Sequence, residues 1–180
     1  MVKIEDVFVA LIKLFSKHKI PYMVVGGFAV AFWGEPRLTK DIDLVLATSK
    51  DILTNLVDIL RDNNYVFHYE ELKMLAKLSN RFAIADATNT FRIDLWIPKT
   101  QYEQRAFERR INKKYNRDKI SLISPEDLIL FKLLANRTKD LDDIKGVLAR
   151  QKGKLDREYL RFWSMALNKE KKLKQLEKSL

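Results

Sequence analysis

Residues 22–47 read YMVVGGFAVAFWGEPRLTKDIDLVLA, and this stretch decides the fold. An apolar run stops at Gly26-Gly27, which predicts a short strand that ends in a tight glycine turn. Residues 28–33 are apolar and stop at a glycine, so they predict a brief helix. Residues 41–47 alternate acidic and large apolar side chains at their start, which predicts a second strand. The expected unit is therefore strand, glycine turn, helix, loop and strand.

The sequence on either side of this unit adds further helices and strands. Apolar residues at helical spacing predict amphipathic helices, and two alternating stretches around Thr88-Asn89-Thr90 predict a hairpin. Ser124 followed by Pro125 and two acids predicts the start of a helix, after which helical patterns continue to the end. The expected helices are residues 5–18, 50–62 and 70–79, and the expected strands are residues 65–69, 81–87 and 91–97.

Chain length sets the number of domains. A chain of 180 residues with 47% hydrophobic residues can bury one good core but hardly two independent ones. The order of the elements predicts an α/β (α+β) fold, with a mixed sheet of about four to six strands flanked by helices. We expect residues 1–123 to form the core and residues 124–180 a C-terminal helical segment packed on it, in one compact unit.

The charge balance favours a partner that carries phosphate. Lysine and arginine number 34 against 24 acidic residues, which gives a formal net charge of +10. Such a charge suits nucleic acid or nucleotides. It also suits an anionic membrane surface or a merely solvated surface, so charge alone does not choose among these interpretations.

The scarcity of two residue types narrows the chemistry. The sequence has no cysteine, which excludes a disulfide framework, a thiolate zinc site and a cysteine nucleophile. Its two histidines, His18 and His68, lie far apart, so carboxylates must hold any metal, and these prefer Mg²⁺ or Mn²⁺. No apolar run reaches the ~18 residues of a membrane span, and the first residues lack a signal pattern. We therefore expect a cytoplasmic protein with no membrane partner.

Two acids share one side of the strand predicted at residues 41–47. Because side chains alternate along a strand, Asp41 and Asp43 point the same way, while Ile42 and Leu44 point into the core. Two close carboxylates repel each other unless a divalent cation lies between them. The motif therefore indicates a metal site, with a pair of solvent-facing acids as the alternative interpretation.

A third acid lies in the second strand of the predicted hairpin. The large apolar residues at 91, 93, 95 and 97 share one face, and Asp94 projects from the other. If this strand pairs beside the strand of Asp41 and Asp43, three carboxylates converge and can hold two Mg²⁺ ions about 3.5 to 4 Å apart. One ion would orient a triphosphate, and the other would lower the pKa of an acceptor hydroxyl for attack at the α-phosphorus.

The glycine pair has its own chemical interpretation. Gly26 and Gly27 come where a strand ends and a helix begins, so backbone N–H groups can bind phosphate oxygens there. Thirteen residues separate Gly27 from Asp41, enough for one short helix and a loop that return the chain to a neighbouring strand. A tight turn without a ligand is the alternative.

In this order the motifs resemble the DNA polymerase beta-like nucleotidyltransferase superfamily. Residues 22–97 carry the resemblance. Within that superfamily, the stretch with Arg37 and Thr39 before the acids is similar to small bacterial and archaeal members related to abortive-infection and toxin-antitoxin nucleotidyltransferases. The matching motifs are Gly26-Gly27, the thirteen-residue spacer, Asp41-Ile42-Asp43-Leu44 and Ile93-Asp94-Leu95.

The resemblance implies a role for each motif residue. Asp41 and Asp43 would bind both magnesium ions, and Asp94 would complete the second metal site near the acceptor hydroxyl. Gly27 stands where many members have a serine, so its contact with phosphate would fall to backbone amides. The nucleotide-binding residues of the core would be Gly26, Gly27, Arg37 and Thr39.

A second resemblance begins at Ser124 and covers the helical segment that follows the core in the same small members. Lys132 is the single charged residue of the apolar run 128–135, and a cation in such surroundings needs an anion or a route to solvent. We expect Lys132 and Asp143 to bind nucleotide. Asp140 and Asp143 share a helix face, where they can orient Lys132, contact the nucleotide or form a structural ion pair.

The densest positive stretch is residues 109–119, with Tyr115 at hand for base stacking. It can follow an RNA backbone, or it can be a charged edge strand or loop exposed to solvent. The lysine-rich tail, residues 168–180, has leucines at helical spacing and predicts a helix whose leucines contact a core or a partner.

The leading hypothesis is an enzyme, a magnesium-dependent nucleotidyltransferase that moves a nucleoside monophosphate from an NTP, ATP among them, to a hydroxyl. The resemblance favours an RNA or tRNA end as acceptor, as in the related toxins, with an antitoxin protein as a partner. The chain is too short for polymerase finger and thumb domains, so templated synthesis is not expected.

Four alternatives remain open at the level of sequence. The acceptor can be a small molecule such as an aminoglycoside or lincosamide, although a chain at +10 argues against pockets for cationic drugs. It can also be a protein side chain. The fold can serve as a noncatalytic nucleotide-binding or partner module. A metal-dependent nuclease would explain the acids but not the glycine turn.

Overall fold

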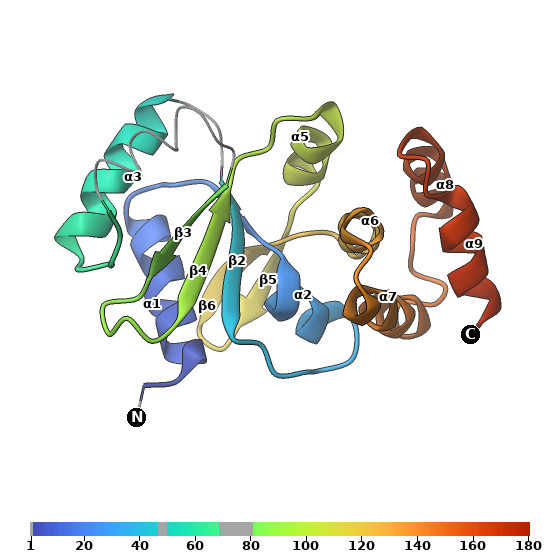
Figure 1. The fold of residues 1–180 in the computed structure, drawn as a ribbon, viewed down its shortest axis with the longest axis horizontal. Coiled ribbons are helices and arrows are strands. Elements are labelled where there is room, and N and C mark those ends of the chain that lie inside the picture. Colours follow the sequence, from blue (N-terminus) through green and yellow to red (C-terminus); the bar gives the residue numbers. More distant parts are fainter. Residues whose placement is uncertain (1, 47–49, 69–80) are drawn as a thin grey trace.

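The computed structural model describes residues 2–46, 50–68 and 81–180. Its centre is a six-stranded mixed sheet with the strand order β3-β4-β2-β1-β6-β5 (Figure 1). The predicted α/β fold with four to six strands is therefore confirmed. The strands are β1 (Tyr22–Val24), β2 (Asp41–Leu46), β3 (Arg81–Ala85), β4 (Arg92–Trp96), β5 (Ile111–Tyr115) and β6 (Asp118–Leu122).

Helices flank this sheet, and the later ones gather beside α2, on the side away from α3 (Figure 1). In the described ranges no helix has the length and apolar character that a membrane crossing requires. The helices are α1 (Ile4–Lys17), α2 (Gly26–Trp33), α3 (Lys50–Asp62), α5 (Gln101–Glu108), α6 (Pro125–Ala135), α7 (Thr138–Arg150), α8 (Arg157–Ala166) and α9 (Glu170–Lys178).

Strand pairing brings the predicted acidic strands together. β2 and β4 are parallel neighbours in which Asp43 is the register partner of Asp94, and Asp41 that of Arg92. β3 pairs antiparallel with β4, as the predicted hairpin requires. Because register partners point to the same face of a sheet, the three aspartates share one face.

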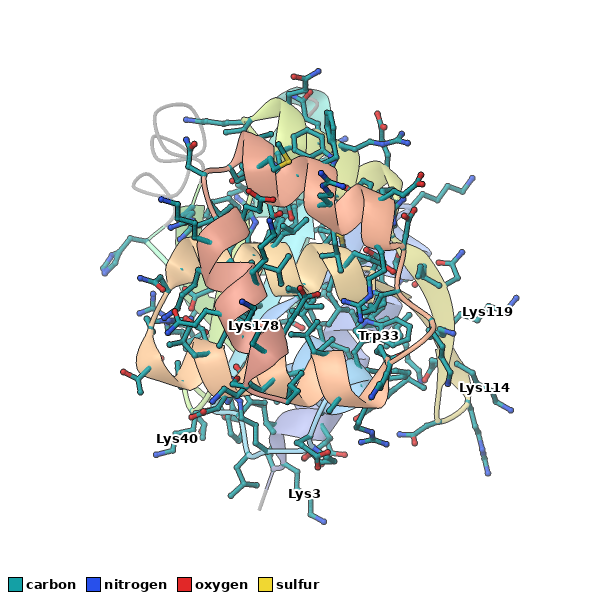
Figure 2. The ribbon with its side chains drawn as sticks, turned by 90° about the vertical axis from the view of Figure 1, so that its right-hand side faces the viewer. Lys3, Trp33, Lys40, Lys114, Lys119 and Lys178 are labelled. Atoms are coloured by element: carbon teal, nitrogen blue, oxygen red, sulfur yellow. The ribbon has the colours of Figure 1, made fainter. Side chains whose placement is uncertain are left out.

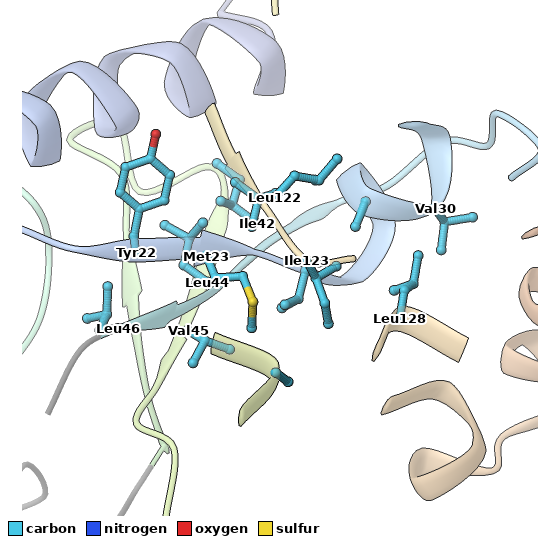
Figure 3. Close-up of a cluster of buried hydrophobic side chains, with 14 of the residues drawn as sticks. Tyr22, Met23, Val30, Ile42, Leu44, Val45, Leu46, Leu122, Ile123 and Leu128 are labelled. Atoms are coloured by element: carbon cyan, nitrogen blue, oxygen red, sulfur yellow. The ribbon is translucent and has the colours of Figure 1, made fainter. Parts of the chain in front are cut away.

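The opposite face of the same strands is the core. Ile42, Leu44, Ile93 and Leu95 are fully buried, which confirms the alternation expected from the sequence. Figure 3 shows Ile42 and Leu44 from β2, Met23 from β1 and Leu122 from β6 in one apolar cluster. Burying side chains of this size stabilises the fold by about 1.5–3 kcal/mol each, so the core holds the acidic face in place from behind.

The C-terminal helices are joined to the sheet by hydrogen bonds at α2. The Trp33 indole Nε1 donates to the Ile123 carbonyl (2.8 Å), at the point where the sheet ends and the helices begin. Arg150 donates to the Gly34 carbonyl (2.8 Å) and Gln151 to that of Trp33 (2.9 Å). α7 is thus attached to the end of α2.

The start of α6 matches the prediction and also anchors α8. Ser124 caps the helix, since its Oγ accepts from the Asp127 backbone N–H (3.1 Å). The buried Asp127 carboxylate accepts from Ser124 Oγ (2.7 Å), Tyr159 Oη (2.7 Å) and Arg109 Nε (3.3 Å). Burial raises the pKa of Asp127, and these donors oppose the rise. One carboxylate therefore joins α6, α8 and the end of α5.

The hairpin strands are shorter than predicted because Asp86 ends them. Its buried carboxylate accepts from the backbone N–H groups of Thr88 (2.9 Å), Thr90 (2.9 Å) and Phe91 (2.6 Å). These bonds fold the connection into a closed loop, so β3 stops at Ala85 and β4 starts after Phe91.

The strand predicted at residues 65–69 is wrong for its described part. Only Val66 forms a bridge, with Ala85. A strand needs hydrogen bonds along its length, and in the described part of the chain Phe67 and His68 add none to this bridge. The helix predicted at 70–79, and the last residue of each strand predicted at 65–69 and 41–47, lie outside the described residues.

The basic stretch forms β5, the turn and the first residues of β6, at the edge of the sheet. The stretch is thus an edge strand with its turn, and its contact with an RNA backbone stays a prediction. Figure 2 shows Lys114 and Lys119 projecting on the opposite side of the view from Lys40. In the tail, Leu173 and Leu176 are buried in this chain's own core, so they are not free to contact a partner.

Candidate active site

A cleft of about 1160 Å³ opens on the sheet face that carries the three aspartates. Small-molecule sites usually enclose about 300–1,000 Å³, so this cleft has room for a nucleotide and part of an acceptor. Its walls come from β2, β3 and β4, the glycine turn, the loop before β2, and α6. The lining residues used below are Gly26, Gly27, Arg37, Thr39, Lys40, Asp41, Asp43, Arg81, Arg92, Asp94, Trp96, Glu103, Phe131, Lys132, Leu134, Arg137 and Lys139.

Asp43 is the central acid of the cleft. Burial raises the pKa of its carboxyl above the ordinary value, and repulsion from Asp94 and then Asp41 raises it further. Lys132 and a hydrogen bond from the Gly27 N–H oppose this rise. The three carboxylates are thus close enough to repel each other, which is the condition that a divalent cation relieves.

Asp94 is held by a cation of its own strand. The Arg92 guanidinium donates to both Asp94 oxygens, at 2.8 to 3.0 Å. Across the described ranges no three acidic or histidine side chains are drawn together tightly enough to form a metal cluster. The donor set nevertheless suits Mg²⁺, since three carboxylates on one face are hard oxygen ligands. Asp94 would have to turn from Arg92 to join Asp41 and Asp43.

Neighbouring side chains leave no room for a Cβ at Gly26 or Gly27. Gly26 has φ +60°, and a Cβ built on it would overlap the Asp43 carboxylate and lie 2.7 Å from Asp43 Cβ. A Cβ on Gly27 would lie 2.5 Å from Thr39 Oγ1. Thr39 Oγ1 donates to the Asp41 carbonyl (3.1 Å). Both glycines therefore let the loop and the acidic strand approach the N-terminus of α2, where the Gly27 N–H donates to the Asp43 carboxylate.

Three cations form what we call the cationic wall: Arg37, Lys132 and Arg137. Two buried carboxylates behind it hold all three. Lys132 Nζ lies 2.8 Å from both Asp140 and Asp143. Arg37 binds Asp143 through two nitrogens (2.8 and 3.1 Å), and Arg137 Nε binds Asp140 (2.7 Å). Burial alone would raise the pKa of Asp140, but hydrogen bonds from Arg137 and Lys132 lower it to about 2.

The nine predicted site residues divide into two groups. Eight line the cleft together, and Asp143 lies buried behind Arg37 and Lys132. The alternative of a lysine that reaches solvent is wrong, because the Lys132 side chain is only 7% exposed and ends on two carboxylates. The structural ion pair considered for Asp140 and Asp143 is present.

Known proteins bear out the nucleotidyltransferase resemblance. The family model described as "Nucleotidyltransferase of unknown function (DUF6036)" matches residues 3–176. This chain belongs to that family. No curated protein matches it.

Solved structures share the fold of this DUF6036 chain. The lincosamide antibiotic adenylyltransferase LnuA, lincomycin-bound, superposes with a TM-score of 0.57 at 20% identity, over 81% of this chain and 96% of its own. ANT(2")-Ia in complex with adenylyl-2"-tobramycin gives 0.59 at 13% identity, over 87% and 93%. An antigenic nucleotidyltransferase-like protein from Paracoccidioides brasiliensis gives 0.52 at 18%, over 94% and 89%. These likenesses establish the fold, while the expected kinship to toxins stays a prediction.

Sequence reasoning missed several lining residues of this DUF6036 chain, among them two on β4. Arg92 and Trp96 lie two residues on either side of Asp94, so strand alternation alone places them on its face. Arg81 reaches the cleft as the register partner of Trp96, and Phe131 reaches it from α6. Those two positions depend on strand register and helix docking, which a single sequence does not contain.

Proposed function

We propose that this chain transfers a nucleoside monophosphate from an NTP to a hydroxyl group, with Asp41, Asp43 and Asp94 as catalytic and metal-binding residues. The observation that carries the proposal is the register of β2 and β4. It pairs Asp43 with Asp94 in a cleft that the cationic wall also lines. Acids beside fixed cations are what triphosphate chemistry with magnesium requires.

In the proposed reaction each group of this chain has a stated task. The Gly26-Gly27 amides and the cationic wall hold the triphosphate oxygens. Asp94 orients the acceptor hydroxyl and takes up its proton. The hydroxyl oxygen bonds to the α-phosphorus, the bond to the β-phosphate bridging oxygen breaks, and pyrophosphate leaves. Mg²⁺ held by the three carboxylates would stabilise the charge that develops on the phosphoryl oxygens.

For the acceptor we propose the hydroxyl of an RNA end, in the cytoplasm. The charge of the cleft supports this choice, because its described lining has seven cationic and four acidic side chains. A polycationic aminoglycoside would find little complementary charge there. An antitoxin partner rests on the sequence resemblance alone.

A lincosamide-like small molecule is the second candidate acceptor. It is favoured by the fold likeness to the lincomycin-bound adenylyltransferase, which this chain covers over 96% of its length. An identity of 20% establishes only the shared fold, so the labelling experiment decides between the two acceptors.

The test is incorporation of label. The protein is incubated with Mg²⁺, each α-labelled NTP in turn, and either total RNA or a small-molecule panel that includes lincomycin. We expect label in RNA, none with EDTA, and a loss of at least about 100-fold in Asp43→Asn, which removes a metal ligand. Asp118→Asn removes a carboxylate 27% exposed on the far hairpin and is expected to keep full activity.

Incorporation into lincomycin instead of RNA would select the second candidate. Absence of label in every acceptor, from a folded protein that still binds NTP, would reject catalysis and leave a nucleotide-binding module. Protein nucleotidylation would appear as label in polypeptide.

A further inference from the structure

Trp96 is the one aromatic residue on the cleft face of β4. It stands two residues after Asp94, and its ring lines the cleft. Its indole Nε1 is buried, and within the described part of the chain it has no hydrogen-bond partner. Most buried N–H groups in proteins are satisfied, and buried tryptophans usually bond through theirs. An unsatisfied donor beside a cleft is available to a ligand atom that reaches it.

Aromatic, apolar and cationic groups surround this donor. The Phe131 ring lies nearly parallel to the indole, at 17° and with centroids 6.1 Å apart. The Arg81 guanidinium lies 4.6 Å from the centroid of the Trp96 ring. Leu134 lines the same cleft and is 43% exposed. Together these residues offer a ring surface, a hydrogen-bond donor and a positive charge.

The position of this cluster separates it from the triphosphate. Gly26 follows β1, the acids lie on β2 and β4, and Arg81 lies on β3. Neighbouring strands are about 4.8 Å apart, so three strand spacings, about 14 Å, separate the glycine turn from Arg81. Asp94 stands between the two ends. A group bound at Trp96 is therefore on the acceptor side of the reacting phosphorus.

The acids of the cleft argue against a cationic occupant at this end. Asp94 is bound by Arg92. Glu103 accepts from the backbone N–H groups of Lys99 (2.9 Å) and Thr100 (3.0 Å) and so serves the cap of α5. Asp94 and Glu103 are therefore both engaged, and the cation at this end of the cleft, Arg81, lies over the Trp96 ring.

We propose that Trp96, Phe131 and Arg81 form an acceptor subsite that binds the terminal nucleotide of an oligonucleotide. The base packs against the rings, a base oxygen or ring nitrogen accepts from Trp96 Nε1, and the phosphate faces Arg81. Base stacking on aromatic side chains is the usual means of holding single-stranded nucleic acid. The inference rests on the proposed function, since it assigns the acceptor of the same site.

The test measures binding rather than turnover. A fluorescein-labelled five-nucleotide RNA of mixed sequence is titrated against the protein with Mg²⁺, with and without a saturating α,β-methylene NTP analogue, and anisotropy is recorded. We expect Trp96→Leu to weaken RNA binding about ten-fold, as loss of one base stack does, and to leave the Kd of the analogue within two-fold. Trp96→Phe keeps a ring and loses the N–H donor, so its affinity for RNA should lie between those of the wild type and Trp96→Leu.

Trp163→Leu is the matched control, because Trp163 is half-buried in α8 and does not line the cleft. It should bind RNA like the wild type. Thermal melts confirm folding, and Trp96→Phe carries the test if Trp96→Leu does not fold. Equal weakening in the control, unchanged binding in both Trp96 variants, or no RNA binding by the wild type would overturn the subsite.

Two further results distinguish a base of the RNA from the base of the incoming nucleotide, and the subsite from the proposed catalysis. Weaker analogue binding in Trp96→Leu, with RNA binding unchanged, would mean that the incoming nucleotide occupies the rings and would reject the acceptor assignment. RNA binding that depends on Trp96, in a protein that transfers no label, would reject the proposed catalysis and keep the subsite.

Discussion

Gly26 has no side chain, and the Asp43 carboxylate fills the space that one would occupy. Two reasons for glycine coincide there, the positive φ of +60° and this contact. Gly153 has only the first of these reasons. Its φ is also positive, at +78°, but nothing lies within 4 Å of a Cβ built on it. The two glycines are therefore a matched pair for substitution.

We expect Gly26→Ala to lower kcat about 100-fold, since Asp43 must move by the order of an ångström to admit the methyl group. Gly153→Ala should leave kcat unchanged and lower the free energy of unfolding by about 1 kcal/mol, the strain of a left-handed alanine. Initial rates and urea denaturation of both variants measure this. Activity of Gly26→Ala within a few-fold of wild type would show that the contact is not needed.

The candidate site was predictable where one strand or one turn sets the geometry. Asp41, Asp43 and Asp94 follow from alternation, and the glycine turn from its place between strand and helix. Asp143 was placed in the pocket because helical spacing cannot tell which side of Lys132 it occupies. Trp96 was passed over because a tryptophan in an apolar run resembles core until the docking of α6 is known.

Helices α6 and α7 are held together by charge as well as by packing. Lys132 of α6 ends on Asp140 and Asp143 of α7, and all three are buried. The lowered pKa of Asp140, about 2, makes the pair a contributor to stability that depends on pH. A depressed carboxyl pKa stabilises the fold above the unfolded value, about 3.9, and that contribution is lost as pH falls toward the folded value.

Between pH 5 and pH 3 we expect the free energy of unfolding of the wild type to fall by about 1 kcal/mol more than that of Asp140→Asn. The variant is less stable throughout, because Lys132 loses a buried partner, so the slopes are compared and not the absolute values. Urea denaturation at several pH values gives both slopes. Parallel curves would mean that Asp140 titrates normally in the fold.

Element boundaries were predictable where local chemistry ends an element. Ser124 and Pro125 mark the start of α6, and the amphipathic pattern fixes α1 within one residue at each end. Residues 65–69 have a strand pattern, but a strand needs a partner along its length, and among the described residues of this stretch only Val66 pairs with β3. The charge of residues 109–119 suited an edge strand or a loop, and the pairing of β5 with β6 decides for the strand.

At the scale of the molecule, one buried carboxylate ties the C-terminal helices to the rest. Asp127 meets Tyr159 of α8 and Arg109 after α5, and the Arg109 guanidinium lies 3.6 Å from the centroid of the Tyr159 ring. We propose that residues 1–123 and 124–180 unfold together, because these contacts and the bonds at Trp33 cross between them.

Tyr159→Phe removes the hydroxyl and keeps the ring. We expect it to lower the free energy of unfolding by about 1.5–3 kcal/mol, the value of a hydrogen bond to a charged group, while circular dichroism and tryptophan fluorescence still report one transition. Tyr115→Phe is the control, since the Tyr115 hydroxyl has no hydrogen bond among the described residues. A separate early transition in Tyr159→Phe would mean that the C-terminal helices detach on their own.

The two carboxylates behind the cationic wall have a consequence for the speed of binding. Arg37, Lys132 and Arg137 repel one another, and Asp140 and Asp143 offset that repulsion when the chain folds. An arriving triphosphate therefore meets donors that already stand in position and need not be gathered. The association rate of the triphosphate is then set by diffusion in the electric field of the wall. It is high in dilute buffer and falls as salt screens the wall.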